Sequence, residues 1–190
     1  MLDSILLSIA KNSILSNFDK HFVFDKQQLI SKYPYLATKG AAFVTLDIEH
    51  QLRGCIGSIV AHRTLLDDII YNAHAAAFSD PRFGPLRSEE LSHLTLEVSV
   101  LTAPELIEYT DFEDLKHQIK PKIDGLILQS GSFQGTFLPQ VWEQLPQPKE
   151  FLEHLSLKAG ANPSIYKEHP NIYRYRVDAI EDKFDAVLPL

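Results

Sequence analysis

The stretch that says most about this chain is Leu52-Arg53-Gly54-Cys55-Ile56-Gly57-Ser58, which contains its one cysteine. Glycine weakens a β-strand unless its missing side chain is needed. Gly54 and Gly57 therefore predict a strand that bulges or that another part of the backbone approaches closely. Arg53 lies two residues before Cys55, and a fixed positive charge near a thiol lowers its pKa. The run thus predicts a strand that carries a candidate functional site.

The composition excludes several classes of protein. Of 190 residues, 45% are hydrophobic and 23% are charged, as in soluble globular proteins, and the formal net charge is −7. That charge disfavours binding to a nucleic acid backbone, which needs a clustered positive surface. No apolar run approaches the length of a membrane span, and the first residues lack a signal-peptide pattern. We expect a cytoplasmic protein that binds neither nucleic acid nor membrane.

The order of the expected elements is mixed, which favours an α+β fold over a doubly wound parallel sheet. Residues 40–48 and 52–60 are expected to pair as an antiparallel hairpin through Glu49-His50-Gln51, and 93–101 alternates between apolar and polar residues as a half-buried strand does. Thr64 is the expected cap of a helix over 65–78, and Thr110 that of a helix through Ile119. Further helices are expected over 3–18, from Asp25 and from Pro148, and further strands over 125–129, 135–138 and 172–180.

Side-chain alternation along these strands indicates which residues share a face. If Leu52 and Ile56 face the core, then Arg53 and Cys55 point to the opposite face. The same argument places Glu97 opposite the apolar row of its strand. If both strands belong to one sheet, Arg53, Cys55 and Glu97 share a polar surface. Residues two apart on a strand lie about 7 Å apart, so the guanidinium would reach the thiol.

Each of these residues also has a purely structural interpretation. A lone cysteine often packs as a small buried hydrophobic group, and Arg53 and Glu97 would then form an ion pair. Arg82, in Asp80-Pro81-Arg82-Phe83, is either tied to a carbonyl or carboxylate in a rigid turn, or lines a cleft and binds an anionic group.

Other chemistry has no support in the sequence. The spacing of the histidines brings none of them to Cys55, and no His, Cys, Asp or Glu spacing indicates a metal site. No phosphate loop or dinucleotide fingerprint is present, so the cofactor stays unknown.

Six short motifs stand out along the chain: 52–58, 80–83, 96–101, 136–141, 151–152 and 158–160. Together they resemble the AMMECR domain family, whose microbial members are called AmmeMemoRadiSam system protein A. The resemblance implies one α+β domain over residues 1–190, mainly an antiparallel sheet with flanking helices. A larger lobe and a smaller lobe, the latter around residues 105–160, would meet near the run at Cys55.

The resemblance does not give a reaction, so two hypotheses about function remain. In the first, the protein is a cytoplasmic small-molecule enzyme that uses Cys55 in a cleft between the lobes. Cys55 and Glu97 are then the candidate catalytic residues, and the candidate substrate-binding residues are Arg53, Gly54, Gly57 and Arg82. In the second, which follows from the family's compound name, the protein is a noncatalytic accessory module that works with Memo-like and radical SAM proteins.

Overall fold

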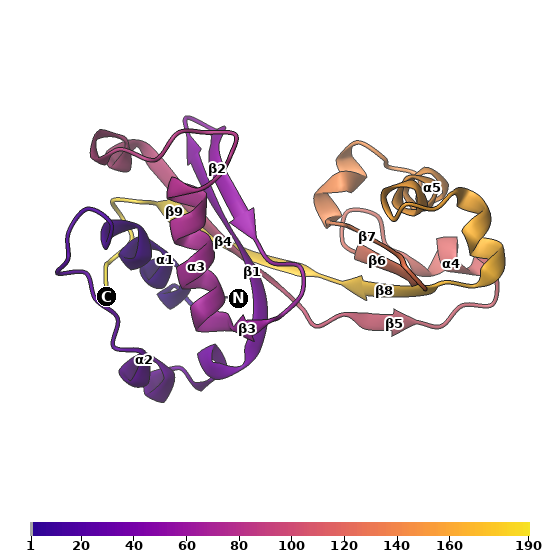
Figure 1. The fold of residues 1–190 in the computed structure, drawn as a ribbon, viewed down its shortest axis with the longest axis horizontal. Helices are drawn as coiled ribbons and strands as arrows, with labels where there is room; N and C mark the ends of the chain where they lie inside the picture. The colour runs from indigo at the N-terminus through magenta and orange to yellow at the C-terminus, as the bar shows by residue number, and fades with distance from the viewer. Residues whose placement is uncertain (1) are drawn as a thin grey trace. The chain divides into compact units, whose positions relative to one another are not determined.

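Helices and antiparallel strands follow one another in irregular order along the chain, and the strands form two separate sheets (Figure 1). The structure is a computed structural model that describes residues 2–190. The α+β fold expected from the sequence is confirmed. The chain divides into two compact units: the first contains the described residues up to Leu101 together with Asp178–Leu190, and the second is Thr102–Val177.

The first unit is built on a sheet with strand order β2-β1-β4-β9, in which β1 pairs antiparallel with both β2 and β4. The predicted hairpin is confirmed, although β2 ends at Gly57. Its turn places Glu49 and His50 at φ 53° and 64°, and positive φ at both central residues is what a two-residue hairpin loop of type I′ requires. The strands are β1 (Lys39–Ile48), β2 (Gln51–Gly57), β3 (Arg63–Thr64), β4 (Leu94–Leu101) and β9 (Val177–Lys183).

Helices α1 (Ile5–Leu15) and α3 (Leu65–Phe78) cover one face of this sheet, and α2 (Lys26–Lys32) precedes β1 (Figure 1). Thr64 caps α3 as predicted, because its side chain accepts a hydrogen bond from the backbone N–H of Asp67. Ile9 of α1 and Ile69 of α3 are fully buried among the inward side chains of β1 and β4. The opposite face of the sheet carries the side chains that alternate with these inward residues, polar ones such as Thr45 and Glu97 as well as Phe43.

Two buried polar side chains hold this unit together. The carboxylate of Asp68 accepts a hydrogen bond from the backbone N–H of Ala42 at 2.8 Å, which ties α3 to β1. The Nζ of Lys11 donates to the carbonyls of Phe184 and Val187 at 2.7 and 2.8 Å, which ties the C-terminal turn to α1. Both side chains are satisfied, as buried polar groups must be.

The second unit contains a sheet with strand order β5-β8-β6-β7. Its core includes Trp142 stacked on Phe151, with ring centroids 3.7 Å apart. Residues 105–160, expected to contribute a smaller lobe, lie inside this unit. Its elements are β5 (Glu105–Ile107), α4 (Phe112–Gln118), β6 (Gly125–Ser130), β7 (Phe133–Phe137), the 3₁₀ turn η3 (Pro139–Glu143), α5 (Pro148–Lys158), the 3₁₀ turn η4 (Pro163–Glu168) and β8 (Asn171–Tyr175).

Two expectations from the sequence are wrong in this region. Asp111, not Thr110, caps α4, because its carboxylate accepts the backbone N–H of Asp114 at 2.8 Å. The single strand expected over 172–180 is interrupted at Arg176, so that β8 and β9 belong to different sheets. Among residues 2–190, no helix is long and apolar enough to cross a membrane.

Candidate functional site

Three neighbouring strands of the first unit bring Cys55, Thr45 and Glu97 into one row. In the register of the sheet, Thr45 lies opposite Cys55 on one side and opposite Glu97 on the other. Their neighbours Val44 and Val98 are buried against the helices, so the row points to the opposite face. The Thr45 Oγ1 hydroxyl donates to the Cys55 Sγ at 3.3 Å. The expected common sheet of Cys55 and Glu97 is thus present, with Thr45 between them.

A β-bulge in β2 changes the position of Arg53. Leu46 pairs with Gly54 but Asp47 pairs with Leu52, so Arg53 is the extra residue. The premise that Leu52 faces the core is therefore wrong, and Leu52 is 41% exposed. The Arg53 guanidinium binds both carboxylate oxygens of Glu90, with its Nε 2.7 Å from Oε1 and its Nη2 3.1 Å from Oε2. Arg53 is thus paired with Glu90 and makes no hydrogen bond with the thiol or with Glu97.

The segment Asp80-Pro81-Arg82-Phe83 docks on the outer edge of β2. The Asp80 Oδ2 accepts the backbone N–H of Cys55 at 2.9 Å, and Arg82 Nη2 donates to the Cys55 carbonyl at 3.3 Å. Asp80 also accepts from the Arg82 backbone at 3.0 Å and from its Nη2 at 2.7 Å. These bonds, of which the Arg82 side-chain bond is the strongest influence, hold the pKa of Asp80 well below its usual range.

The backbone N–H of Cys55 points away from β1, toward Asp80, and this direction determines how its side chain lies relative to Thr45. When the backbone groups of a residue in an antiparallel pair point away from its partner, the pair is the non-hydrogen-bonded kind, in which the two side chains lie closer together. This is the arrangement of Cys55 and Thr45. Asp80 and Arg82 thus position the thiol through its backbone.

The electrostatics of the thiol differ from the sequence expectation. Burial raises the pKa of Cys55 and outweighs the hydrogen bond from Thr45 and the charge of Arg82, both of which lower it. The carboxylates of Asp80 and Glu97 raise the pKa further. The cation that acts on the thiol is therefore Arg82 and not Arg53. At neutral pH the thiol is protonated.

The two glycines of the run are explained by packing. A Cβ on Gly54 would lie 2.2 Å from the carbonyl oxygen of Ala76, because α3 approaches β2 closely there. A Cβ on Gly57 would lie 2.2 Å from the ring of Phe43, which fills that space. Gly54 therefore faces the helix side of the sheet, away from Cys55. Because Ala76 and Phe43 fill the space beside them, neither glycine leaves its backbone open to a ligand on the face that carries Cys55.

Thr45 is a site residue that the sequence reasoning missed, whereas the alternation of 93–101 already places Ser99 on the same face as Glu97. The Ser99 Oγ donates to Glu97 Oε1 at 2.9 Å and holds that carboxylate. The available signal was the alternation of β1, which places Thr45 and Asp47 on the same side of the strand. In residues 2–190 no histidine hydrogen-bonds to Cys55, and that part of the chain contains no group of three or more potential metal ligands.

The fold and this site define an α+β protein that carries one half-buried thiol on the polar face of an antiparallel sheet. A family model described as AMMECR1 matches residues 7–180, and the chain belongs to that family.

Relatives of known sequence and structure support this assignment. Protein SSO0193 of Saccharolobus solfataricus is 42% identical over 170 residues, which are 85% of this chain and 73% of that protein. Protein MJ0810 of Methanocaldococcus jannaschii is 36% identical over 172 residues, or 86% of this chain and 84% of that protein. The crystal structure of the uncharacterized protein PH0010 from Pyrococcus horikoshii has a TM-score of 0.76 at 33% identity, covering 95% of this chain and 91% of that one.

Proposed function

We propose that the protein is a cytoplasmic enzyme acting on a small molecule, with Cys55 as its nucleophile. The observation that supports this most is the cross-strand row of Cys55, Thr45 and Glu97. Three different strands place a thiol, a hydroxyl and a carboxylate side by side on the face that the helices leave free. Because the chain has one cysteine, it cannot form an internal disulfide, which favours nucleophilic over dithiol redox chemistry.

In the proposed step a base must remove the thiol proton, since burial keeps Cys55 protonated. Glu97 is the carboxylate of the row, and because Thr45 lies between it and the thiol, it accepts that proton through a bridging water. The S–H bond breaks, the sulfur electron pair forms a bond to the carbon of a carbonyl group of the substrate, and the C=O π electron pair moves to the carbonyl oxygen. Thr45 holds the sulfur in place. The side chain of Arg82, 55% exposed, offers a cation to an anionic group of the substrate.

Alkylation of the single thiol with iodoacetamide, followed by mass spectrometry as a function of pH, tests this proposal. We expect the midpoint to lie above the usual thiol value of about 8.5. Glu97→Gln removes a negative charge and lowers the midpoint, whereas Thr45→Val removes a stabilising hydrogen bond and raises it. Glu89→Gln, on an exposed carboxylate of the 3₁₀ turn Ser88–His93, is the control and leaves the midpoint unchanged. A folded protein that stays unmodified at every pH, while the unfolded chain reacts, refutes the proposal.

The second candidate function is a noncatalytic accessory module that works with Memo-like and radical SAM proteins. This alternative is supported by the lack of a base beside the thiol. The pKa of Cys55 is raised, and within the described residues no histidine is hydrogen-bonded to it. Capture of both partners on immobilised protein, retained by Cys55→Ser, is the expected result. Failure to capture either partner contradicts this alternative.

A further inference from the structure

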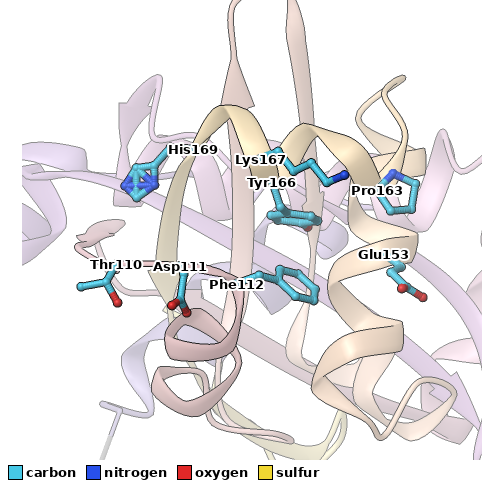
Figure 2. A pocket seen from close by; sticks show the side chains of 8 residues that line it. All are labelled: Thr110, Asp111, Phe112, Glu153, Pro163, Tyr166, Lys167 and His169. Carbon is cyan, nitrogen blue, oxygen red and sulfur yellow. The ribbon is translucent and has the colours of Figure 1, made fainter.

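The second unit contains a cavity of about 470 Å³ that the candidate site does not use (Figure 2). Its walls come from the start of α4, the middle of α5 and the 3₁₀ turn η4. Small-molecule sites in proteins have volumes of roughly 300–1,000 Å³, apolar walls and a few polar groups. The volume of this cavity and its mixture of apolar and charged lining residues match that description.

The wall of the cavity is aromatic and fixed. The rings of Phe112 and Tyr166 lie with centroids 4.9 Å apart, and Pro163 adds a further apolar surface. The Tyr166 hydroxyl donates to the backbone carbonyl of Leu152 at 2.5 Å, so this side chain offers its ring and not its hydroxyl to a ligand. Tyr166 is 8% exposed and both rings pack against the core of the unit. The wall is therefore formed before any ligand binds.

The rim carries groups of both charges. Glu153 projects from α5 and Lys167 from η4, next to Pro163 in Figure 2. Among the described residues, the one cation within 4.0 Å of the Glu153 carboxylate is the exposed Lys149, at 3.9 Å. Within residues 2–190, Lys167 forms no ion pair within 4.0 Å, although it shares the cavity with Glu153. Asp111, also on the rim, uses one carboxylate oxygen to cap α4. Within the part of the chain that the structure describes, the weakly paired Glu153 and the unpaired Lys167 are thus available to bind a ligand.

We propose that this cavity binds a small zwitterion with an aromatic body, of the class of the aromatic amino acids. Its ring lies against Phe112 and Tyr166, since aromatic rings stack favourably in offset or tilted arrangements. Its ammonium group binds Glu153 and its carboxylate binds Lys167. A ligand with only one charge leaves one of these two groups without a partner, and complementary charges give specificity. This site is independent of Cys55.

Isothermal titration calorimetry with four compounds tests the inference. L-tryptophan carries both charges and the ring, tryptamine lacks the carboxylate, indole-3-propionate lacks the ammonium, and L-alanine lacks the ring. A charge-assisted hydrogen bond corresponds to about a tenfold change in affinity or more. We expect L-tryptophan to bind at least about tenfold more tightly than each of the other three. Equal affinities, or no binding of L-tryptophan at millimolar concentration, would overturn the inference.

Two variants test which residue of the rim binds each charged group of the ligand. Glu153→Gln weakens binding of L-tryptophan about tenfold and leaves that of indole-3-propionate unchanged. Lys167→Met weakens binding of L-tryptophan similarly and leaves that of tryptamine unchanged. Glu168→Gln changes an exposed neighbour that does not line the cavity and serves as the matched control. If both rim variants bind L-tryptophan as the wild type does, the assignment is wrong.

Discussion

The carboxylate of Asp80 is the group whose removal tests the architecture of the thiol site most directly. It is 4% exposed and accepts hydrogen bonds from the backbone amides of Cys55 and Arg82 as well as from the Arg82 side chain. In Asp80→Asn one oxygen becomes an NH₂ group that cannot accept. One amide then loses its charged acceptor, and the other keeps only a neutral one.

The magnitude follows from these bonds. A hydrogen bond to a charged group contributes roughly 1.5–3 kcal/mol and a neutral one about 1 kcal/mol. Solvent screens the ion pair with the half-exposed Arg82, so it adds little. We expect Asp80→Asn to lower the free energy of unfolding by about 2–5 kcal/mol at pH 7.

The sign of the pH dependence is fixed by the lowered pKa of Asp80. The carboxylate stabilises the folded state fully above about pH 4, the ordinary aspartate pKa. As the pH falls below that value toward the lowered pKa of the folded protein, the contribution is lost. The difference between the wild type and Asp80→Asn should therefore shrink with acidification.

Urea unfolding at pH 7, 4 and 3 measures this difference. Asp19→Asn is the control, because its pair with His21 is exposed on both sides, and it should behave as the wild type. A difference between the wild type and Asp80→Asn that is absent at pH 7, or that grows on acidification, refutes the reasoning.

Three further predictions concern the surroundings of the site and the C-terminus. Gly54→Ala places a methyl group 2.2 Å from a carbonyl of α3 and should cost at least about 2 kcal/mol in urea unfolding, whereas Gly84→Ala, with open space around it, should change stability by less than about 1 kcal/mol. Arg53→Met removes both guanidinium hydrogen bonds to the mostly buried Glu90, which keeps only the Arg87 backbone N–H at 2.8 Å and the Arg87 side chain at 3.7 Å among the described residues. We expect a loss of about 2–3 kcal/mol and a rise of the Glu90 pKa from about 2, measured by NMR titration. Lys11→Met should speed hydrogen exchange of the amides at 184–187, because it removes two hydrogen bonds to that turn; unchanged exchange would show that these bonds do not hold it.

Elements with a local signal were predictable from the sequence. The β1–β2 hairpin follows from two alternating segments around a short loop, and β4 follows from its regular alternation. The helix over 65–78 follows from its cap at Thr64 and its apolar stripe.

Features that depend on pairing between distant segments were not predictable. The bulge at Arg53 is defined only by the register with β1, so counting side-chain parity along β2 alone placed Leu52 on the wrong face. The break at Arg176 likewise depends on which sheet each half joins.

The candidate site was predictable in part for the same reason. Parity connected Cys55 with Glu97 but could not select Thr45 as the residue between them, since the order of strands is a tertiary property. The cavity of the second unit was missed because Phe112, Glu153 and Tyr166 come from three segments with no common pattern in the sequence.

The docking of Asp80 and Arg82 on β2 also covers part of an edge of the sheet. β2 is the outermost strand of its sheet, and an outermost strand offers free N–H and C=O groups to any other extended chain. At Cys55 these two groups are occupied by the Asp80 carboxylate and the Arg82 guanidinium. An incoming strand would have to displace a charged pair that contributes to folding. The same two side chains that orient the thiol therefore block strand addition, and losing them would make this edge a starting point for aggregation.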